Sequence, residues 1–250
     1  MLRSIRTVLG YTIQALDGYI GLSKDFLFDD RQWVVRYLIV KTEKWLPGRK
    51  VLVSPRFIND LNWAARIIKI NCSRVSIESS PRLDMHAPVS HEFETAFYDH
   101  YTVANHWPVT EPRDNPTNGY AQVTENSNHF NNSANHNPPI SKTYGLQLVS
   151  EVTGYNIEAR DKLTGHVEDF IVDEHSWQIR YLVIDTRNWL PAPKVIVNPQ
   201  WFKTVDWNHK KISTRLTARQ IKDSPRYHPW DPVNIKSATC LYDYRGRPVK

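Results

Sequence analysis

The chain contains two copies of one sequence. Residues 10–99 align without a gap with residues 154–243, and adding 144 to a residue number in the first gives its counterpart in the second. About one third of the paired positions are identical. The identical runs include Gly10-Tyr11 with Gly154-Tyr155, Trp33 with Trp177, Trp63 with Trp207, Ser80-Pro81-Arg82 with Ser224-Pro225-Arg226, and Tyr98-Asp99 with Tyr242-Asp243. A repeat of this length is a whole domain. We therefore expect two domains of about 100 residues, each folded around its own core.

The segment between the copies differs from both of them. Residues 104–143 are rich in Asn, Pro, Thr, Ser and His and poor in aliphatic side chains. Such a composition cannot bury enough apolar surface to offset the entropy of ordering. We predict copy one at residues 1–103, a disordered linker at 104–143 and copy two at 144–250. A flexible linker of about 40 residues reaches on the order of 35 Å, which would let the domains pack in any mutual orientation.

The pattern within each copy predicts strands. Runs rich in β-branched and aromatic residues, bounded by turn residues or proline, are typical of strands. The predicted strands are residues 12–15, 26–28, 34–40 and 50–53 in copy one, and 178–184 and 194–197 in copy two. One helical pattern comes late in each copy, as at residues 216–222, where Thr217 is a candidate N-cap and Ser224-Pro225 ends the helix. The predicted fold is all-β: two tandem small antiparallel β-barrels, each with a short C-terminal helix, joined by a flexible linker.

Composition narrows the class of protein. The net charge of +6 is shared between the copies and forms no basic tail. The sequence has no run of about 18 apolar residues, and its start lacks a signal-peptide pattern. Cys72 and Cys240 fall in no motif that the copies share, so we interpret them as small buried apolar residues. These observations predict a cytoplasmic protein with no transmembrane segment.

Motifs for catalysis and metal binding are missing from the sequence. It contains no Gly-x-Ser-x-Gly, no glycine-rich phosphate loop, no cysteine with a supporting histidine and no His-Glu-x-x-His. Six histidines gather near the end of copy one and in the linker, but their spacing fits no ligand motif. We therefore predict a protein that is not an enzyme and that has no catalytic, metal-binding or cofactor-binding residues.

The residues shared by the copies resemble those of the PRC-barrel family. In copy one the resemblance rests on Gly10, Asp17-Gly18, Gly21, Asp25-Phe26, Asp29, Trp33, Arg36-Tyr37-Leu38, Thr42, Trp45-Leu46-Pro47-Gly48-Arg49-Lys50-Val51 and Pro55. In copy two it rests on Gly154, Asp161, Gly165, Asp169-Phe170, Asp173, Trp177, Arg180-Tyr181-Leu182, Asp185-Thr186, Trp189-Leu190-Pro191, Lys194-Val195 and Pro199.

The PRC-barrel family is named after the photosynthetic reaction centre, whose H subunit carries such a barrel in its cytoplasmic part. A related barrel forms the C-terminal domain of a ribosomal small-subunit maturation factor. The resemblance implies a fold used for binding and assembly, with no shared catalytic residue. The chain lacks an N-terminal membrane span of the H-subunit kind, which argues against its being that subunit.

The repeated arginines Arg36 and Arg180 interrupt apolar strands. If they are buried, each needs a partner of opposite charge. The repeated acids are natural candidates, so we predict structural ion pairs of Arg36 with Asp25 or Asp29, and of Arg180 with Asp169 or Asp173. A ligand-binding arginine is the alternative.

The repeated Trp-Leu-Pro triplets follow predicted strands. They are Trp45, Leu46 and Pro47 in copy one, and Trp189, Leu190 and Pro191 in copy two. Apolar residues in a loop must be covered, and a tryptophan beside a rigid proline suits an interaction anchor. The simplest partner of each triplet is the other copy. Each tryptophan folding back onto its own barrel is the alternative.

The densest basic stretch lies in copy two and is only partly matched in copy one. Its members are Lys203, Lys210, Lys211, Arg215, Arg219 and Lys222. A solvated face is the favoured explanation, and a phosphate-binding face is the alternative.

The sequence thus predicts a non-enzymatic interaction or scaffold protein whose partner is another protein. Two alternatives stay open. One is binding to RNA or to a ribosome precursor, and the other is association, as a soluble accessory protein, with a membrane electron-transfer complex. Positions where the copies differ are where we expect specificity.

Overall fold

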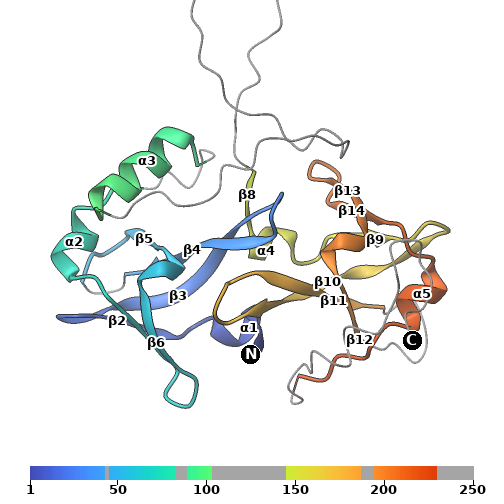
Figure 1. Ribbon diagram of the computed structural model, residues 1–250, viewed down its shortest axis with the longest axis horizontal. Coiled ribbons are helices and arrows are strands. Elements are labelled where there is room, and N and C mark those ends of the chain that lie inside the picture. Colours follow the sequence, from blue (N-terminus) through green and yellow to red (C-terminus); the bar gives the residue numbers. More distant parts are fainter. Residues whose placement is uncertain (43–44, 83–88, 103–144, 187–193, 230–250) are drawn as a thin grey trace, which may run out of the picture.

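The fold is mostly β, with two seven-stranded sheets (Figure 1). The computed structural model describes residues 1–42, 45–82, 89–102, 145–186 and 194–229. In those ranges no helix has both the length and the apolar character needed to cross a membrane.

The sheet of copy one contains six strands from that copy, in the order β5-β4-β3-β2-β7-β6. They are β2 (Thr12–Ala15), β3 (Gly18–Asp29), β4 (Val34–Lys41), β5 (Lys50–Val53), β6 (Ile58–Asn62) and β7 (Ile67–Ile70). All neighbours are antiparallel except β2 and β7, which are parallel. The strands at 12–15, 34–40 and 50–53 are confirmed, and the one at 26–28 is the end of the longer β3.

The sheet of copy two repeats this arrangement in the order β12-β11-β10-β9-β14-β13. Its strands are β9 (Asn156–Glu158), β10 (Leu163–Asp173), β11 (Ile179–Asp185), β12 (Lys194–Val197), β13 (Phe202–Asp206) and β14 (Lys211–Thr214). The parallel pair is β9 and β14. Among the described strands both sheets are open, because the end strands β5 and β6, and likewise β12 and β13, are not paired with each other. The mostly β fold is confirmed, whereas barrel closure is absent from these pairings.

Short helices follow the strands in both copies. The predicted helix of copy two is α5 (Ala218–Lys222). It is capped by Thr217, whose hydroxyl accepts from the Gln220 N–H, and the Gln220 side chain accepts from the Thr217 N–H in return. Its counterpart in copy one is α2 (Arg74–Glu78). Short 3-10 turns, η1 (Pro55–Phe57) and η2 (Pro199–Trp201), begin at the two repeated prolines. A longer helix, α3 (His91–His100), lies on the outer side of copy one and was not predicted (Figure 1).

The two copies exchange their first strands. β1 (Leu2–Ser4) is the start of copy one, but it pairs with β10 of copy two. β8 (Leu146–Leu148) is the start of copy two, but it pairs with β3 of copy one. Leu2 lies opposite Asp173, and its counterpart Leu146 lies opposite Asp29, so the exchange is reciprocal in register.

The short helices after these strands are exchanged as well. α1 (Ile5–Val8) contacts β10, and α4 (Val149–Val152) contacts β3. Each sheet therefore reaches seven strands only by taking one from the other copy. The boundary at residue 103 does not separate the two sheets, because residues 2–8 join copy two and residues 146–152 join copy one.

A direct backbone bridge marks the centre of this arrangement. Val34 pairs antiparallel with Gln178. Gln178 is the residue that corresponds to Val34 in the repeat. On one side the Val35 N–H donates to the Trp177 carbonyl at 2.9 Å, and on the other the Ile179 N–H donates to the Trp33 carbonyl at 2.7 Å. The two copies are thus related by a local two-fold axis. The reach of the linker would permit any mutual orientation, and these bonds and the exchanged strands fix one of them.

The core is continuous across the two copies. One buried cluster runs from Ile5 in copy one to Ile221 in copy two. Aromatic rings make the crossing: the ring of Phe28 lies 5.6 Å from that of Phe170, and Trp33 lies 5.5 Å from Phe202. Trp177 stacks on Phe26 at 6.0 Å. The expectation of a separate core in each copy is therefore wrong.

Candidate interaction surface

Asp25 and Asp169 cap the exchanged helices. Asp169 Oδ1 accepts from the Arg6 N–H at 3.2 Å, and the Ser4 hydroxyl donates to Oδ2. In the other half, Asp25 Oδ1 accepts from the Ser150 N–H at 3.2 Å, and the Ser150 hydroxyl donates to Oδ2. Each carboxylate therefore satisfies free N–H groups at the start of a helix from the other copy. The prediction that these acids pair with the repeated arginines is wrong.

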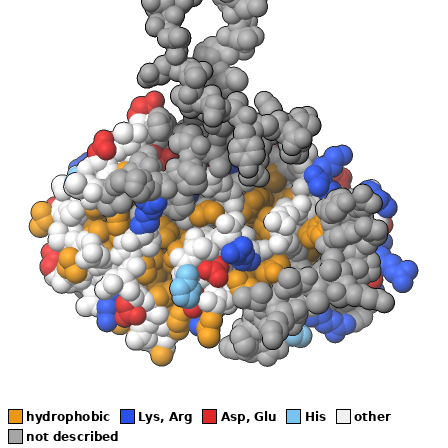
Figure 2. Space-filling model, viewed as in Figure 1, with side chains coloured by type: hydrophobic (Ala, Val, Ile, Leu, Met, Phe, Trp, Pro, Cys, Tyr) orange, Lys and Arg blue, Asp and Glu red, His pale blue; other side chains and the backbone are white. Residues whose placement is uncertain are grey.

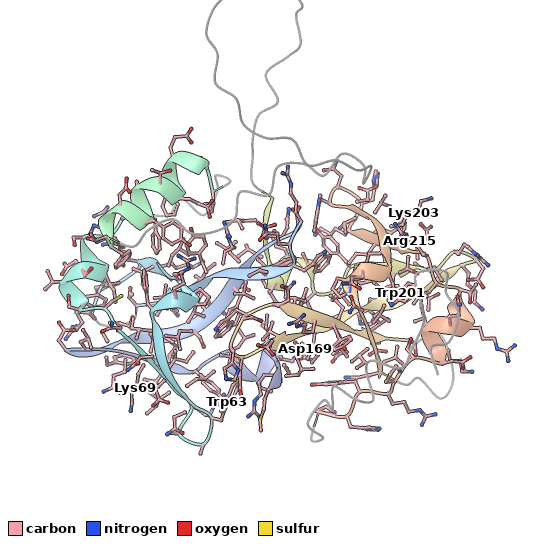
Figure 3. All side chains as sticks on the ribbon, in the orientation of Figure 1. Trp63, Lys69, Asp169, Trp201, Lys203 and Arg215 are labelled. Atoms are coloured by element: carbon pink, nitrogen blue, oxygen red, sulfur yellow. The ribbon has the colours of Figure 1, made fainter. Side chains whose placement is uncertain are left out.

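Asp169 is the more deeply buried of the two caps, near the middle of the molecule (Figure 3). Burial raises the pKa of Asp169, because removal from water disfavours the carboxylate, although bonds from Ser4 and from the Phe170 and Arg6 amides oppose the shift. The Phe170 amide donates to it at 2.7 Å. The carboxyl group thus joins the exchanged segment to the sheet.

Asp29 and Asp173 shape the turns that lead to the two-fold axis. Asp29 Oδ1 accepts from the Arg31 and Gln32 amides at 2.9 and 3.0 Å. Asp173 Oδ1 accepts from the two equivalent amides, at 3.1 and 3.0 Å. The turns place Trp33 and Trp177 at φ 55° and 56°, a left-handed conformation that is unusual for a bulky residue. The prediction that these acids are ion-pair partners is wrong too, because local turn formation uses them.

Arg36 is buried and paired with an acid, but the acid is Glu94 of α3 and not Asp25 or Asp29. The Arg36 guanidinium lies 3.7 Å from the Glu94 carboxylate, and both side chains are nearly inaccessible to water. Glu94 also accepts a hydrogen bond from the Tyr37 hydroxyl at 3.0 Å. Sequence reasoning missed Glu94 because it considered only acids present in both copies, and the counterpart of Glu94 is Ala238.

Helix α3 covers one face of the copy-one sheet with aromatic side chains. Phe97 packs edge-on against Tyr37 at 5.2 Å and stacks on Phe57 at 6.2 Å. Tyr101, just after the helix, lies 4.6 Å from Phe57. We call Arg36, Tyr37 and Phe57 the α3 seat.

Copy two keeps the arginine and tyrosine of the seat, has tryptophan in place of phenylalanine, and leaves all three side chains more exposed. The counterparts of Arg36, Tyr37 and Phe57 are Arg180, Tyr181 and Trp201. Arg36, Tyr37 and Phe57 are 5%, 0% and 7% exposed, whereas Arg180 is exposed and Tyr181 and Trp201 are half-buried. Arg180 has no ion pair with a residue in the described ranges. The predicted pairing of Arg180 with Asp169 or Asp173 is therefore wrong.

The Trp-Leu-Pro triplet of copy one contacts its own copy. The Arg74 guanidinium lies over the Trp45 ring at 4.9 Å, and Trp45 packs on the core. The Leu46 carbonyl accepts from the Thr42 hydroxyl at 2.7 Å, and Pro47 is exposed. These contacts support a tryptophan that covers its own half. Trp189, Leu190 and Pro191 lie outside the described residues, so the second triplet stays a prediction.

The predicted basic stretch divides into paired and unpaired cations. Lys211 lies 3.2 Å from Glu158, and Arg219 lies 3.7 Å from Asp223. In contrast, Lys203, Lys210 and Arg215 are exposed, and within the described ranges they have no ion pair. Lys222 is exposed on α5.

Lys203 and Arg215 form a small basic patch beside Trp201. The Arg215 N–H donates to the Trp201 carbonyl at 2.9 Å, and Lys203 is the extra residue at a bulge between Phe202 and Thr204. Figure 3 shows Lys203 and Arg215 next to each other above Trp201, and Figure 2 shows basic side chains at the same end of the molecule. The counterparts of the two cations in copy one are Asn59 and Asn71.

Among the described residues, one group of side chains has metal-ligand chemistry that its sequence spacing does not show. Ligand atoms of His166, Glu168 and Asp185 lie within 4.8 Å of one another. However, Glu168 is held by Arg6 and Lys194, both at 2.7 Å. Burial alone would raise the pKa of Glu168, but the bonds and charges of Lys194 and Arg6 outweigh it and lower the pKa to about 2. The two cations make this an ion-pair network that disfavours a bound metal ion.

Comparison with known proteins gives no match, either to a family model or to a curated protein. The fold and contacts define the class of molecule: a mostly β, internally duplicated chain whose halves exchange strands around a local two-fold axis. Its candidate interaction surface comprises Arg180, Tyr181, Trp201, Lys203 and Arg215, all in copy two.

Proposed function

We propose that this chain is a non-enzymatic interaction protein, built from two PRC-barrel-like units, that binds a protein partner through copy two. One observation carries the proposal: Asp25 and Asp169 are used to join the halves, whereas Arg180, Tyr181 and Trp201 are more exposed than their counterparts in copy one. Beside them Lys203 and Arg215 stand where copy one has Asn59 and Asn71. A location in the cytoplasm belongs to the same proposal.

Support for the PRC-barrel-like class comes from the motif and its place in the sheets. Both copies have the same strand order, and the Arg-Tyr-Leu motif occupies equivalent strands, β4 and β11. The Asp-Phe pairs occupy equivalent positions on β3 and β10. A fold in which the repeated polar residues maintain the framework is suited to binding and assembly.

The test uses the full chain as bait in its native cell extract, followed by purification of the captured partner and measurement of rebinding. Arg180→Glu and Lys203→Glu reverse charges on the proposed surface, and Lys24→Glu, at an exposed position of copy one, is the matched control. We expect the copy-two substitutions to weaken rebinding and the control to leave it unchanged. Equal binding by all variants would reject the surface, and a catalytic turnover of the partner would reject the non-enzymatic function.

RNA is the second candidate partner because Lys203, Lys210 and Arg215 are exposed cations without ion pairs among the described residues, and Lys203 and Arg215 lie beside Trp201. Cations beside a stacking ring are typical of single-strand binding. Each phosphate contact adds roughly 0.7 to 0.9 to the slope of log K against log salt. Three contacts predict a slope of about −2 to −3, reduced by Lys203→Glu. Failure to retain RNA at low salt would remove this candidate.

A further inference from the structure

We propose that the copy-two equivalent of the α3 seat binds an amphipathic helix of a partner protein, one that carries a glutamate and aromatic residues spaced as in α3. This inference rests on the proposed interaction function and specifies the chemistry of the partner. The receptor residues are Arg180, Tyr181 and Trp201.

Copy one provides the template for the complex. On α3, Glu94 accepts from the Tyr37 hydroxyl and lies 3.7 Å from Arg36, so one carboxylate meets both polar groups of the seat. Phe97 lies one turn further along and contacts Tyr37 and Phe57. The helix is therefore held by one acidic residue and a row of aromatic rings. A seat of this kind should select helices that carry an acid and aromatic residues at the same spacing.

Copy two preserves the geometry that presents these groups. In copy one a register shift between Leu27 and Phe28 makes Arg36 the bulged residue on β4. The same shift between Ile171 and Val172 makes Arg180 the bulged residue on β11. A bulge re-aims side chains, which explains how Arg36 can face the same helix as its neighbour Tyr37. Tyr181 packs against an apolar cluster, as does Tyr227. The cluster consists of Leu2, Ile171, Val183 and Ile196.

The sequence that corresponds to α3 in copy two lacks the carboxylate that meets the arginine in copy one. Residues 235–244 are the counterparts of α3 and lie outside the described residues. In them Ser237 replaces Phe93 and Ala238 replaces Glu94. They offer no carboxylate at the position that meets the arginine. Since the seat keeps its arginine while residues 235–244 have no acid at the matching position, charge complementarity favours a helix from another protein.

The probe is a peptide with the sequence of residues 90–102, because α3 occupies the equivalent seat in copy one. Thr95 and Asp99 are exposed on α3 and four residues apart, so a lactam between Thr95→Lys and Asp99 would hold the peptide helical. Binding to the full-length protein is measured by fluorescence anisotropy. The matched control peptide carries Glu94→Ala and the same lactam.

We expect the peptide to bind the wild-type protein, and we expect both Glu94→Ala in the peptide and Arg180→Glu in the protein to weaken binding by at least tenfold. Arg219→Glu, at an exposed position of α5, should leave binding unchanged. Arg180→Gln is a second variant if charge reversal disturbs folding, which circular dichroism would reveal.

Three results would overturn the proposal: no binding to the wild-type protein, equal weakening by Arg219→Glu, or binding that appears only after removal of residues 235–250. The last would show that the chain's own tail occupies the seat. The proposed function fails separately. A captured partner that is sensitive to Lys203→Glu but not to Arg180→Glu keeps the interaction function and rejects the helix seat.

Discussion

The exchange of the first strand and helix predicts that a cavity made near the N-terminus will open the sheet of copy two. Ile5 lies on α1, is 0% exposed and belongs to the continuous core. Replacement of such a residue by alanine removes buried methyl groups and leaves a cavity, at a cost of about 2 to 5 kcal/mol. For a chain of this size that corresponds to a fall in Tm of at least about 4 °C.

The location of the damage is the decisive measurement. α1 packs mainly against β10 of copy two, whereas its contact with β3 is through the Ser23 hydroxyl, which donates to the Val8 carbonyl at the end of the helix. In native-state hydrogen exchange, Ile5→Ala should therefore reduce protection of the β10 amides more than that of the β3 amides. A loss of 2 kcal/mol in a local opening reaction corresponds to about 30-fold faster exchange. Peptide-level mass spectrometry resolves the two strands, because they are far apart in sequence.

The reciprocal substitution provides the control. Val149 on α4 is buried against copy one, so Val149→Ala should reduce protection of β3 more than that of β10. The loss is smaller, about 1.6 kcal/mol for two methyl groups. If Ile5→Ala instead exposed β3 and spared β10, the strand exchange would be refuted. Two separate unfolding transitions, only one of them shifted, would refute the continuous core.

Three further predictions follow from other contacts. Gly165→Ala would put a Cβ 2.3 Å from a backbone oxygen of β11, so chemical denaturation should show a loss of about 3 kcal/mol in the free energy of unfolding. Gly154 lies at φ +93° with open space around it, so Gly154→Ala should lower the free energy of unfolding by about 1 to 2 kcal/mol. Because the pKa of Glu168 is lowered in the folded state, its carboxylate stabilises the fold above pH 4.5, and this contribution should disappear as the pH falls toward 2. The Tm of Glu168→Gln should therefore approach that of the wild type over this range. A difference in Tm that stays constant with pH would contradict the assignment. Proteolytic cleavage within residues 104–143 should leave the halves associated in gel filtration, because the exchanged strands do not depend on the linker; separation of the halves would count against them.

Strand positions could be predicted because they depend on local pattern. The run Val34–Val40 is β-branched and aromatic with one charge, and Pro55 follows the strand Lys50–Val53. Residue type and the proline at the strand end were therefore sufficient to predict both strands. Thr217 was recognisable as a cap for the same reason. These features need only residues that are close together in the sequence.

The exchange could not be predicted, because the repeat removes the information that would reveal it. Asp29 and Asp173 are identical, so the first strand of either copy meets the same acid whether it pairs within its own copy or with the other. The caps at Asp25 and Asp169 are also identical, so they do not distinguish a helix of the same copy from a helix of the other copy. Local chemistry specifies that a first strand pairs at this position, but not which copy supplies that strand.

The partner of Arg36 was missed for the opposite reason. Glu94 occurs in one copy only, and the search for a partner was confined to repeated acids. Ser90 as an N-cap and Glu92 and Glu94 in the first turn were available signals for a helix at this position. Comparison of the copies identifies the common framework well, but it hides residues that serve one half alone.

The bridge between Val34 and Gln178 bears on how such a chain can diversify. In a dimer of identical chains, a residue on the two-fold axis always faces itself, and every substitution changes both halves together. Here the two positions on the axis are encoded separately and already differ, as do Glu94 and Ala238. Covalent fusion fixes the stoichiometry of the halves at one to one and frees each from copying the other. One half can then keep the assembly intact while the other acquires a new binding specificity.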